Sequence, residues 1–365
     1  MQSWLYTLNN SIIFVQYQII IFMQNNNRFI PTLALLIFII TPIFINAQDI
    51  NRIKVYEDSI VSISKRILSE RNEEKRLKTN ELLWKYVDKA TRQEGSINYD
   101  FDTLNFVSVL TSDDKKFRIF TWTIRMNDGR FQYYGITQSY VKNTKSYRYN
   151  KLNDYTARLG RPNSKNLSPK KWYGAYYYKL VQTKSGKKTY YTLLGWKGYD
   201  KVISMKVIEV ATLKLSGDVV FGYPIFNIRE YEYFKNSRAR RLVFKYSARV
   251  KMYLDYDIQS IHIEKKKKKK PYSKNQRGFT AQNKEVKETV KVKTITKPMI
   301  VMDRLEPTNE ELEGVYEFYY PETNVVDALL FENNKWNYYP DVDARNNSKD
   351  EKGAKPKKAI NYDLY

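Results

Sequence analysis

The feature that most constrains this chain is a sixteen-residue run, 241–256, in which every second residue is apolar. The apolar positions are Leu242, Phe244, Tyr246, Ala248, Val250, Met252, Leu254 and Tyr256. Because successive side chains of a strand point to opposite faces, the run predicts a strand with one buried face and one solvent-exposed face. At about 3.3 Å per residue such a strand would reach roughly 50 Å, so we expect a bulge or bend inside it.

Alternation and turn residues predict further strands on both sides of this run. Residues 116–125 and 131–140 flank an Asn-Asp-Gly turn, which indicates a hairpin. A second hairpin is predicted over 172–183 and 188–196, joined by the polar turn 184–187. The last strands are expected at 315–319, 325–331 and 336–339.

Residues 54–96 show helical periodicity instead. Ile60, Ile63 and Ile67 fall on one helical face, and the polar stretch 69–79 either continues the helix or turns it. Asn80 is a candidate N-cap for a second segment that carries Leu83, Trp84 and Val87. The expected fold class is therefore α+β and mostly β, in which a helix or helical hairpin precedes a large antiparallel sheet, sandwich or partly open barrel.

The predicted organisation has four parts. Residues 1–47 form a signal segment, 54–96 the helical element, 97–346 the β-rich body and 347–365 a charged tail. Inside the body, six consecutive lysines at Lys265–Lys270 open a polar stretch that ends near 284. Like charges at this density repel one another, which predicts a disordered insertion near 265–284.

The first 47 residues are typical of an export signal. Arg28 precedes an apolar stretch from Leu33 to Ile45, and Ala47 offers a cleavage point. Met23 would begin a signal of ordinary length, so residues 1–22 are a candidate mis-assigned start. We expect cleavage near Ala47 and a mature protein in the periplasm or outside the cell.

Composition excludes several kinds of chemistry. The chain has no cysteine and one histidine, His262, which excludes disulfides, thiolate metal sites and a cysteine nucleophile. After the signal segment no apolar stretch approaches the roughly twenty residues of a spanning helix, so we predict no integral membrane span in the mature chain. No cofactor is predicted.

The cations are concentrated in one region. Residues 142–190 hold thirteen lysines and arginines against one acid, Asp154, whereas 303–346 hold eleven acids against three basic residues. Aromatic residues lie among these cations, a combination that suits an acidic polymer or a glycan. The candidate binding residues are Lys171, Trp172, Tyr173, Lys179, Lys187, Lys188 and Trp196. Nucleic acid is not expected as a partner, because export removes the protein from the cytoplasm.

Three pairs of acids are candidates for acid–base or metal chemistry. They are Asp100/Asp102, Asp255/Asp257 and Asp341/Asp343, and on a strand residues i and i+2 share a face. Asp341 and Asp343 are the preferred pair, because Arg345 and Asn346 follow them closely. The alternative interpretation is a solvated loop held by Asp–Arg pairing.

Several phrases in the second half resemble a family of exported proteins of Bacteroidetes-type bacteria that has no assigned activity. These phrases lie, in order, at 171–180, 191–196, 204–210, 220–226, 240–256, 314–319 and 341–346. The resemblance spans about 170–346 and implies export and a β-rich body. It brings no catalytic residue and no cofactor.

Two functions remain open from the sequence. The leading hypothesis is an envelope-associated or secreted protein with a structural or binding role, whose ligand is an acidic polymer, a glycan or an envelope component. The alternative is a carboxylate-dependent glycan hydrolase, in which Trp172, Trp196 and Trp336 would stack on sugars. Whether the chain is an enzyme, and its oligomeric state, are not decided by these patterns.

Overall fold

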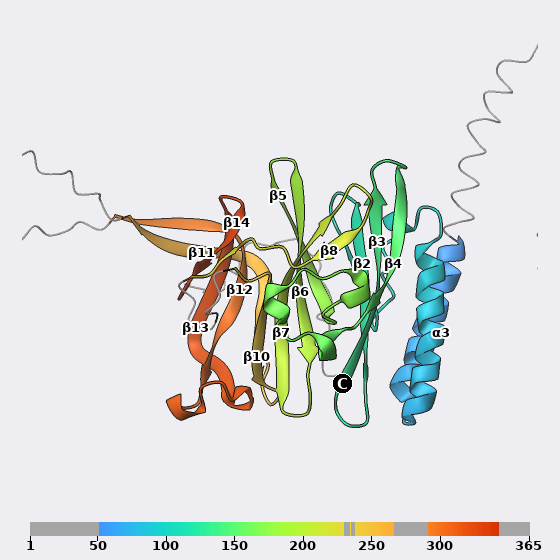
Figure 1. Ribbon diagram of the computed structural model, residues 1–365, viewed down its shortest axis with the longest axis horizontal. Helices are drawn as coiled ribbons and strands as arrows, with labels where there is room; N and C mark the ends of the chain where they lie inside the picture. The colour runs from blue at the N-terminus through green and yellow to red at the C-terminus, as the bar shows by residue number, and fades with distance from the viewer. Residues whose placement is uncertain (1–50, 230–233, 235–237, 266–290, 343–365) are drawn as a thin grey trace, which may run out of the picture.

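The computed structural model describes residues 51–229, 234, 238–265 and 291–342. The predicted signal segment, the lysine-rich insertion from residue 266 to its end and the charged tail lie outside these residues. The expected fold class is confirmed: two N-terminal helices precede three sheets whose strands are mostly antiparallel. Figure 1 shows helices and sheets side by side as successive layers, with the helices at one end and the C-terminal sheet at the other.

The helical element is a pair of helices. The first covers residues 51–69 and the second, α3, covers Glu73–Thr91. Asn72, not Asn80, caps α3, since its side chain accepts a hydrogen bond from the Lys75 amide at 2.9 Å. The predicted cap at Asn80 is wrong because Asn80 is buried in α3, where its Oδ1 accepts from Trp122 Nε1 at 2.7 Å.

The first sheet has the order β1-β2-β3-β4 and contains the first predicted hairpin. Its strands are β1 (Ser108–Thr111), β2 (Phe117–Arg125), β3 (Phe131–Val141) and β4 (Ser146–Asn153). Ile53, Ile60, Leu83 and Val87 of the helices pack on Trp122 and other residues on one face of this sheet. The other face packs on the second sheet, so most of β2 is buried on both sides.

The second sheet is the central layer, with the order β10-β7-β6-β5 and β8 paired to β7. Its strands are β5 (Tyr176–Ser185), β6 (Lys188–Gly198), β7 (Ile203–Leu213), β8 (Val219–Phe221) and β10 (Arg241–Ser247). The second predicted hairpin is confirmed as β5 and β6, which pair from Tyr176↔Trp196 to Ser185↔Lys188.

The third sheet has the order β11-β12-β13-β14-β9. Its strands are β9 (Phe226–Asn227), β11 (Leu254–Lys265), β12 (Lys291–Pro307), β13 (Tyr319–Glu332) and β14 (Lys335–Tyr339). The strand predicted at 315–319 is wrong, because residues Tyr316–Phe318 form a 3₁₀ turn and β13 begins at Tyr319.

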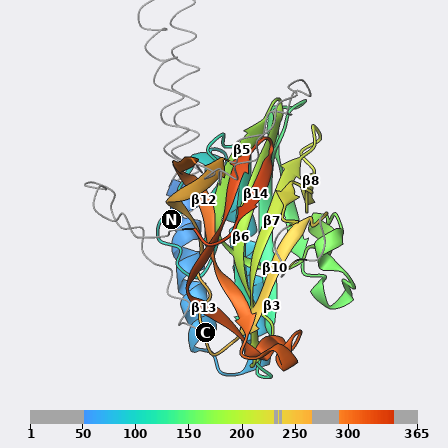
Figure 2. The same ribbon diagram turned by 90° about the vertical axis from the view of Figure 1, so that its left-hand side faces the viewer.

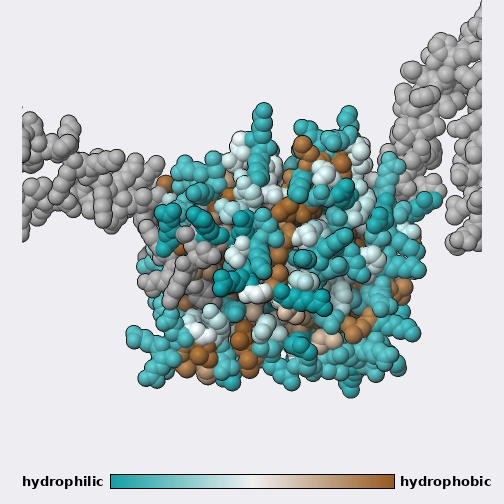
Figure 3. All heavy atoms as spheres, in the orientation of Figure 1, coloured by the Kyte–Doolittle hydropathy of each residue, from teal (hydrophilic) through white to brown (hydrophobic). Residues whose placement is uncertain are grey.

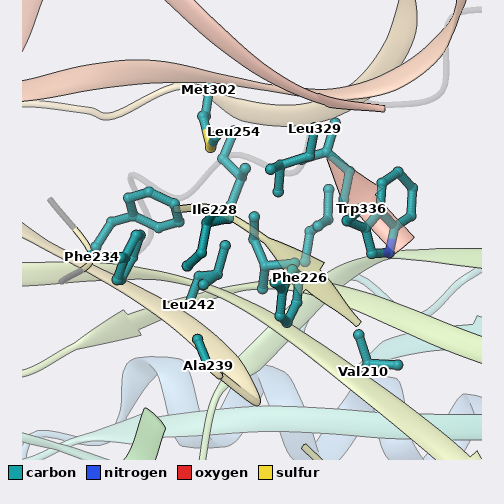
Figure 4. Close-up of a cluster of buried hydrophobic side chains, with 14 of the residues drawn as sticks. Val210, Phe226, Ile228, Phe234, Ala239, Leu242, Leu254, Met302, Leu329 and Trp336 are labelled. Carbon is teal, nitrogen blue, oxygen red and sulfur yellow. The ribbon is translucent and has the colours of Figure 1, made fainter. Parts of the chain in front are cut away.

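The core between the second and third sheets contains the apolar residues of the 241–256 run. Leu242, Leu254, Met302, Leu329 and Trp336 point toward one another there (Figure 4). The expected bend is present: β10 ends at Ser247 in the second sheet, and the chain resumes at Leu254 in the third. The predicted solvent-exposed face is only partly wrong: Ser247 is buried, as are Arg241 and Val243 on the same face of β10, whereas Lys245 is half-exposed and Arg249 and Lys251 are exposed.

Candidate functional site

A long connection between β4 and β5, residues 154–175, lies across the edges of the first two sheets. We call it the bridging loop. The Trp172 amide donates to Asn153 O at 3.0 Å and the Tyr155 amide to Trp172 O at 2.8 Å, which fixes the loop to the end of β4. Leu167 pairs with Phe221 of β8, and the Arg240 amide donates to Asn163 O at 2.7 Å. Figures 1 and 2 show the loop with its short helical turns on one side of the stacked sheets.

A buried charged network holds the bridging loop from below. Glu209 of β7 and Arg241 of β10 are both fully buried, and Arg241 Nε donates to Glu209 Oε1 at 2.6 Å. Arg241 also donates to the carbonyls of Pro162 and Lys165 in the loop. Tyr177 donates its hydroxyl proton to Glu209, and burial raises the pKa of that hydroxyl. The network therefore ties the loop backbone to the central sheet.

Lys197 forms a second internal anchor for the same loop. Its ammonium donates to Thr156 Oγ1 at 3.0 Å, Tyr173 O at 3.1 Å and Gly174 O at 2.6 Å. It also lies 4.1 Å from the ring centroid of Tyr133 and 4.9 Å from that of Tyr173. Burial lowers the pKa of Lys197 to about 8, and the nearby carboxylates of Asp154 and Glu209 oppose that shift.

The cations of the bridging loop itself are exposed. Arg158 and Lys171 flank the ring of Tyr155, with their charged groups 5.6 and 5.7 Å from its centroid. Arg161, Lys165 and Lys170 are exposed as well. The loop therefore presents its charges outward, while its aromatic residues Trp172 and Tyr173 fill the core beneath.

Four turns meet at one end of the stacked sheets and carry many lysines. They connect β1 to β2, β3 to β4, β5 to β6 and β7 to β8. Within and beside these turns lie eight lysines, Lys115, Lys116, Lys142, Lys145, Lys184, Lys187, Lys188 and Lys214, against the three aspartates Asp113, Asp114 and Asp218. We call this group the tip surface. Figure 3 shows hydrophilic side chains on the hairpins that project at this end.

Direct contacts join the four turns into one surface. The Asp114 amide donates to Gln182 Oε1 at 3.2 Å, which links the first turn to β5. The Tyr140 amide donates to Lys116 O at 2.8 Å, and the Lys142 amide to Leu215 O at 3.2 Å. The lysines are therefore held at fixed positions relative to one another at their backbones, although their side chains reach into solvent.

The tip surface is continuous with the bridging loop through Lys188, Tyr223 and Arg240. Lys188 Nζ lies 3.6 Å from the ring centroid of Tyr223. Arg240 Nη1 donates to Asn166 Oδ1 of the loop at 2.5 Å and approaches Gly222 O at 3.4 Å. We call the tip surface, these three residues and the exposed cations of the bridging loop the basic surface.

The predicted binding residues do not all lie on one surface. Lys171, Lys187 and Lys188 are exposed on the basic surface, whereas Trp172 and Tyr173 are buried in the core, so their rings do not face solvent. Lys179 pairs with Asp255 of β11 at 3.6 Å. Trp196 is half-buried and lies near the end of β6 opposite to Lys188. Its ring packs against that of Phe131, with 5.1 Å between the ring centroids.

Sequence reasoning missed Tyr223, Arg240 and the lysines at 115 and 214. These residues lie outside the basic stretch 142–190, and only the pairing of distant turns brings them to it. A signal for Tyr223 was present, since a Gly-Tyr-Pro sequence is typical of a sharp change of chain direction.

The acidic pairs lie in three separate parts of the fold. Asp100 and Asp102 are exposed after the helices, and Asp255 and Asp257 lie on β11. Asp341 follows β14, and its amide donates to Asp327 Oδ1 at 3.1 Å, while Asp343 lies outside the described residues. Asp327 is itself occupied, because Arg304 Nη2 donates to it at 2.6 Å and Tyr338 at 2.9 Å. Among the residues that the structure describes, no group of three or more acids or histidines is arranged to hold a metal ion.

Comparison with known proteins adds no further assignment: no family model, no curated protein and no solved structure matches this chain. Within the described part of the chain, none of the helices combines the length and apolar character that crossing a membrane requires.

Proposed function

We propose that this chain is an exported envelope-associated or secreted protein that binds an acidic polymer on the basic surface. The observation that carries the proposal is that all thirteen cations of residues 142–190 are exposed or half-exposed, and ten of them lie on the basic surface, although that stretch also supplies much of the core. Their like charges repel one another, so a polymer that neutralises them gains favourable electrostatic energy at many points.

The dominance of lysine on this surface indicates how the ligand is recognised. An ammonium is a point charge on a flexible stem and does not impose the paired geometry of a guanidinium. A set of lysines on several turns therefore suits repeated charges along a flexible chain, as in an acidic glycan. The three acidic pairs that the sequence offered for a glycan hydrolase lie in separate parts of the fold, and the proposal does not use them.

A binding comparison tests the proposal. The wild-type protein is titrated with polygalacturonate and with dextran sulfate, and neutral dextran serves as the uncharged reference. A triple variant, Lys142→Glu, Lys187→Glu and Lys214→Glu, should bind the acidic polymers at least tenfold more weakly. The matched control is Lys65→Glu, Lys78→Glu and Lys85→Glu, which changes three exposed helix lysines and the net charge by the same amount.

Equal loss of binding in the two triple variants would show that net charge alone is responsible and would contradict a defined surface. Binding should also weaken as salt is raised, because the contacts are between exposed charges. Export is tested separately, by determining whether the secreted or periplasmic protein has an N-terminus near Gln48; retention of the whole chain in the cytoplasm would contradict it.

A further inference from the structure

Backbone hydrogen bonds hold the junction between the tip surface and the bridging loop. Tyr223 lies at its centre, and its backbone is fixed on both sides. The amides of Gly222 and Tyr223 both donate to Val210 O, at 2.8 and 3.1 Å, and the Ile225 amide donates to Tyr223 O at 3.0 Å. The phenol is thus presented from a rigid segment rather than from a hairpin tip.

Gly222 allows the two parts of this junction to approach closely. Its φ of +88° is in the region that favours glycine, and a Cβ there would lie 2.8 Å from Lys165 O and 3.3 Å from Arg240 Cβ. The absence of a side chain at 222 therefore lets the bridging loop and Arg240 pack directly beside Tyr223.

Arg240 is held on one side only. Its Nη1 donates to Asn166 Oδ1, and its backbone amide donates to Asn163 O. Within the described residues, no acceptor is found for its Nε or Nη2 and no carboxylate forms an ion pair with it. A guanidinium whose Nη1 is held by Asn166 Oδ1 and Gly222 O, and whose other N–H groups stay available, is arranged to bind an oxyanion.

Lys188 and the Tyr223 hydroxyl complete the set of donors. Lys188 is exposed, lies 3.6 Å from the Tyr223 ring centroid and forms no ion pair in the described part of the chain. A hydrogen bond from Lys188 is the largest cause that lowers the pKa of the Tyr223 hydroxyl; the charge of Lys188, a hydrogen bond from Tyr190 and the charge of Arg240 act in the same direction. A phenol in such a field is a stronger hydrogen-bond donor to an anion.

We propose that Lys188, Tyr223 and Arg240 form an anchoring site for one oxyanion group of the bound polymer, a carboxylate or a sulfate. The inference rests on the proposed function and adds to it a fixed point of contact. The lysines of the tip surface attract the polymer without fixed geometry, whereas this site binds one charged group through an ammonium, a phenol and a guanidinium. The site therefore determines where along its length the polymer is held.

The experiment compares variants that lose a donor at this site with one that loses the same charge nearby. Tyr223→Phe keeps the ring and removes the hydroxyl, and Lys188→Met and Arg240→Met each remove one charge. Lys184→Met, an exposed lysine on the same hairpin, is the matched control. Dissociation constants are measured for galacturonate oligomers and for sulfated dextran oligomers at fixed ionic strength, and the tighter of the two identifies the group that the site prefers.

We expect Lys188→Met and Arg240→Met to weaken binding of the preferred oligomer about tenfold, Tyr223→Phe about threefold or more, and Lys184→Met less than threefold. Binding of the preferred oligomer should also perturb the ultraviolet absorbance of wild-type tyrosine, and Tyr223→Phe should remove that change. If Lys184→Met weakens binding as much as Lys188→Met, and Tyr223→Phe has no effect, the anchoring site is wrong while the polyanion surface stands. If the wild-type protein binds neither oligomer, both proposals are overturned.

Discussion

Replacing Glu209 by glutamine removes the negative charge that faces Arg241 in the interior of the protein. The two residues lie directly opposite each other on β7 and β10, and both side chains are fully buried. Glutamine has nearly the same shape and still accepts a hydrogen bond from Tyr177. The change therefore tests the charge of Glu209 rather than its volume.

The magnitude follows from the burial of both partners. With charge centres roughly 4 Å apart and an effective dielectric constant of about 20, their attraction is about 4 kcal/mol. In Glu209→Gln the guanidinium of Arg241 stays buried without a counter-charge, and removing one partner of a buried pair typically costs about 3–5 kcal/mol. We expect the free energy of unfolding to fall by about that amount at pH 7.

The assay is urea unfolding, followed by the fluorescence of the five tryptophans that come after the predicted signal segment. Asp88→Asn is the control, because Asp88 pairs with the half-exposed Arg92 on the surface and such pairs contribute about 1 kcal/mol or less. Arg241→Met combined with Glu209→Gln should cost clearly less than the sum of the two single changes. A loss below about 1 kcal/mol in Glu209→Gln, or strict additivity in the double variant, would refute the reasoning.

Three further changes test other contacts. Trp122→Phe should lower the free energy of unfolding by about 1–3 kcal/mol, because it leaves the buried Asn80 Oδ1 without its donor. Trp84→Phe should cost less, since Trp84 Nε1 has no partner among the described residues. Equal costs of the two variants in urea unfolding would contradict this. Gly222→Ala should destabilise the folded protein by about 1–2 kcal/mol or more, because residue 222 has a positive φ and a Cβ there would contact Lys165 O. Gly160→Ala should be nearly neutral, because a Cβ at 160 would meet no other atom. A neutral Gly222→Ala would argue against the close approach of the bridging loop. Burial lowers the pKa of Lys197 to about 8 from 10.5, so between these values the unfolded chain keeps a proton that the folded chain has released, and stability from this group rises with pH. The denaturation midpoint of Lys197→Met should therefore rise less between pH 8 and pH 10 than that of the wild type, and an unchanged rise would show that Lys197 does not titrate there.

The alternation of 241–256 predicted the buried face of the run correctly, and its exposed face correctly at Arg249 and Lys251 but not at Ser247 in β10. Leu242, Phe244 and Leu254 all enter one core, because the chain turns from the second sheet into the third and both sheets face that core. A period of two reports which residues share a side of the strand, but it does not report how many layers the fold has. Arg241 resembles a surface residue in sequence, and only its pairing with Glu209 across the central sheet makes its burial possible.

The sequence predicted approximately where the helical element begins and ends, but it did not predict the residue at which its second helix begins. Asn72 and Asn80 are chemically equal candidates for a cap, and the sequence around Asn80 is more apolar. The deciding contact is tertiary: Trp122 of β2 takes the Asn80 side chain, which leaves Asn72 to begin α3. No local pattern carries that information.

The candidate site was predicted as a basic stretch but not as a set of residues. Charge segregation along the chain predicted the exposure of these side chains, because thirteen cations beside one acid cannot be buried together, and all of them are exposed or half-exposed. Aromatic residues in the same stretch were ambiguous, since a tyrosine at an alternate position fits a core as well as a binding face. Trp172 and Tyr173 proved to be core residues, whereas Tyr155 of the same stretch does lie between the exposed Arg158 and Lys171. A further ring beside exposed cations, Tyr223, is thirty-five residues beyond Lys188 in the chain.

The open edge of the third sheet shows what the Asp255/Asp257 pair does in this fold. Among the strands that the structure describes, β11 has a hydrogen-bonded neighbour on one side only, and Ile258 is opposite Pro298 of β12. The amide of Tyr256 donates to Asp255 Oδ1 and the amide of Ile258 to Asp257 Oδ1, each at 2.7 Å. Unpaired amides on a strand edge are a template for another chain, and nearby charges discourage such pairing. Asp255 and Asp257 therefore accept hydrogen bonds from two amides of β11 and place two charges beside this edge, an arrangement that disfavours pairing with another strand.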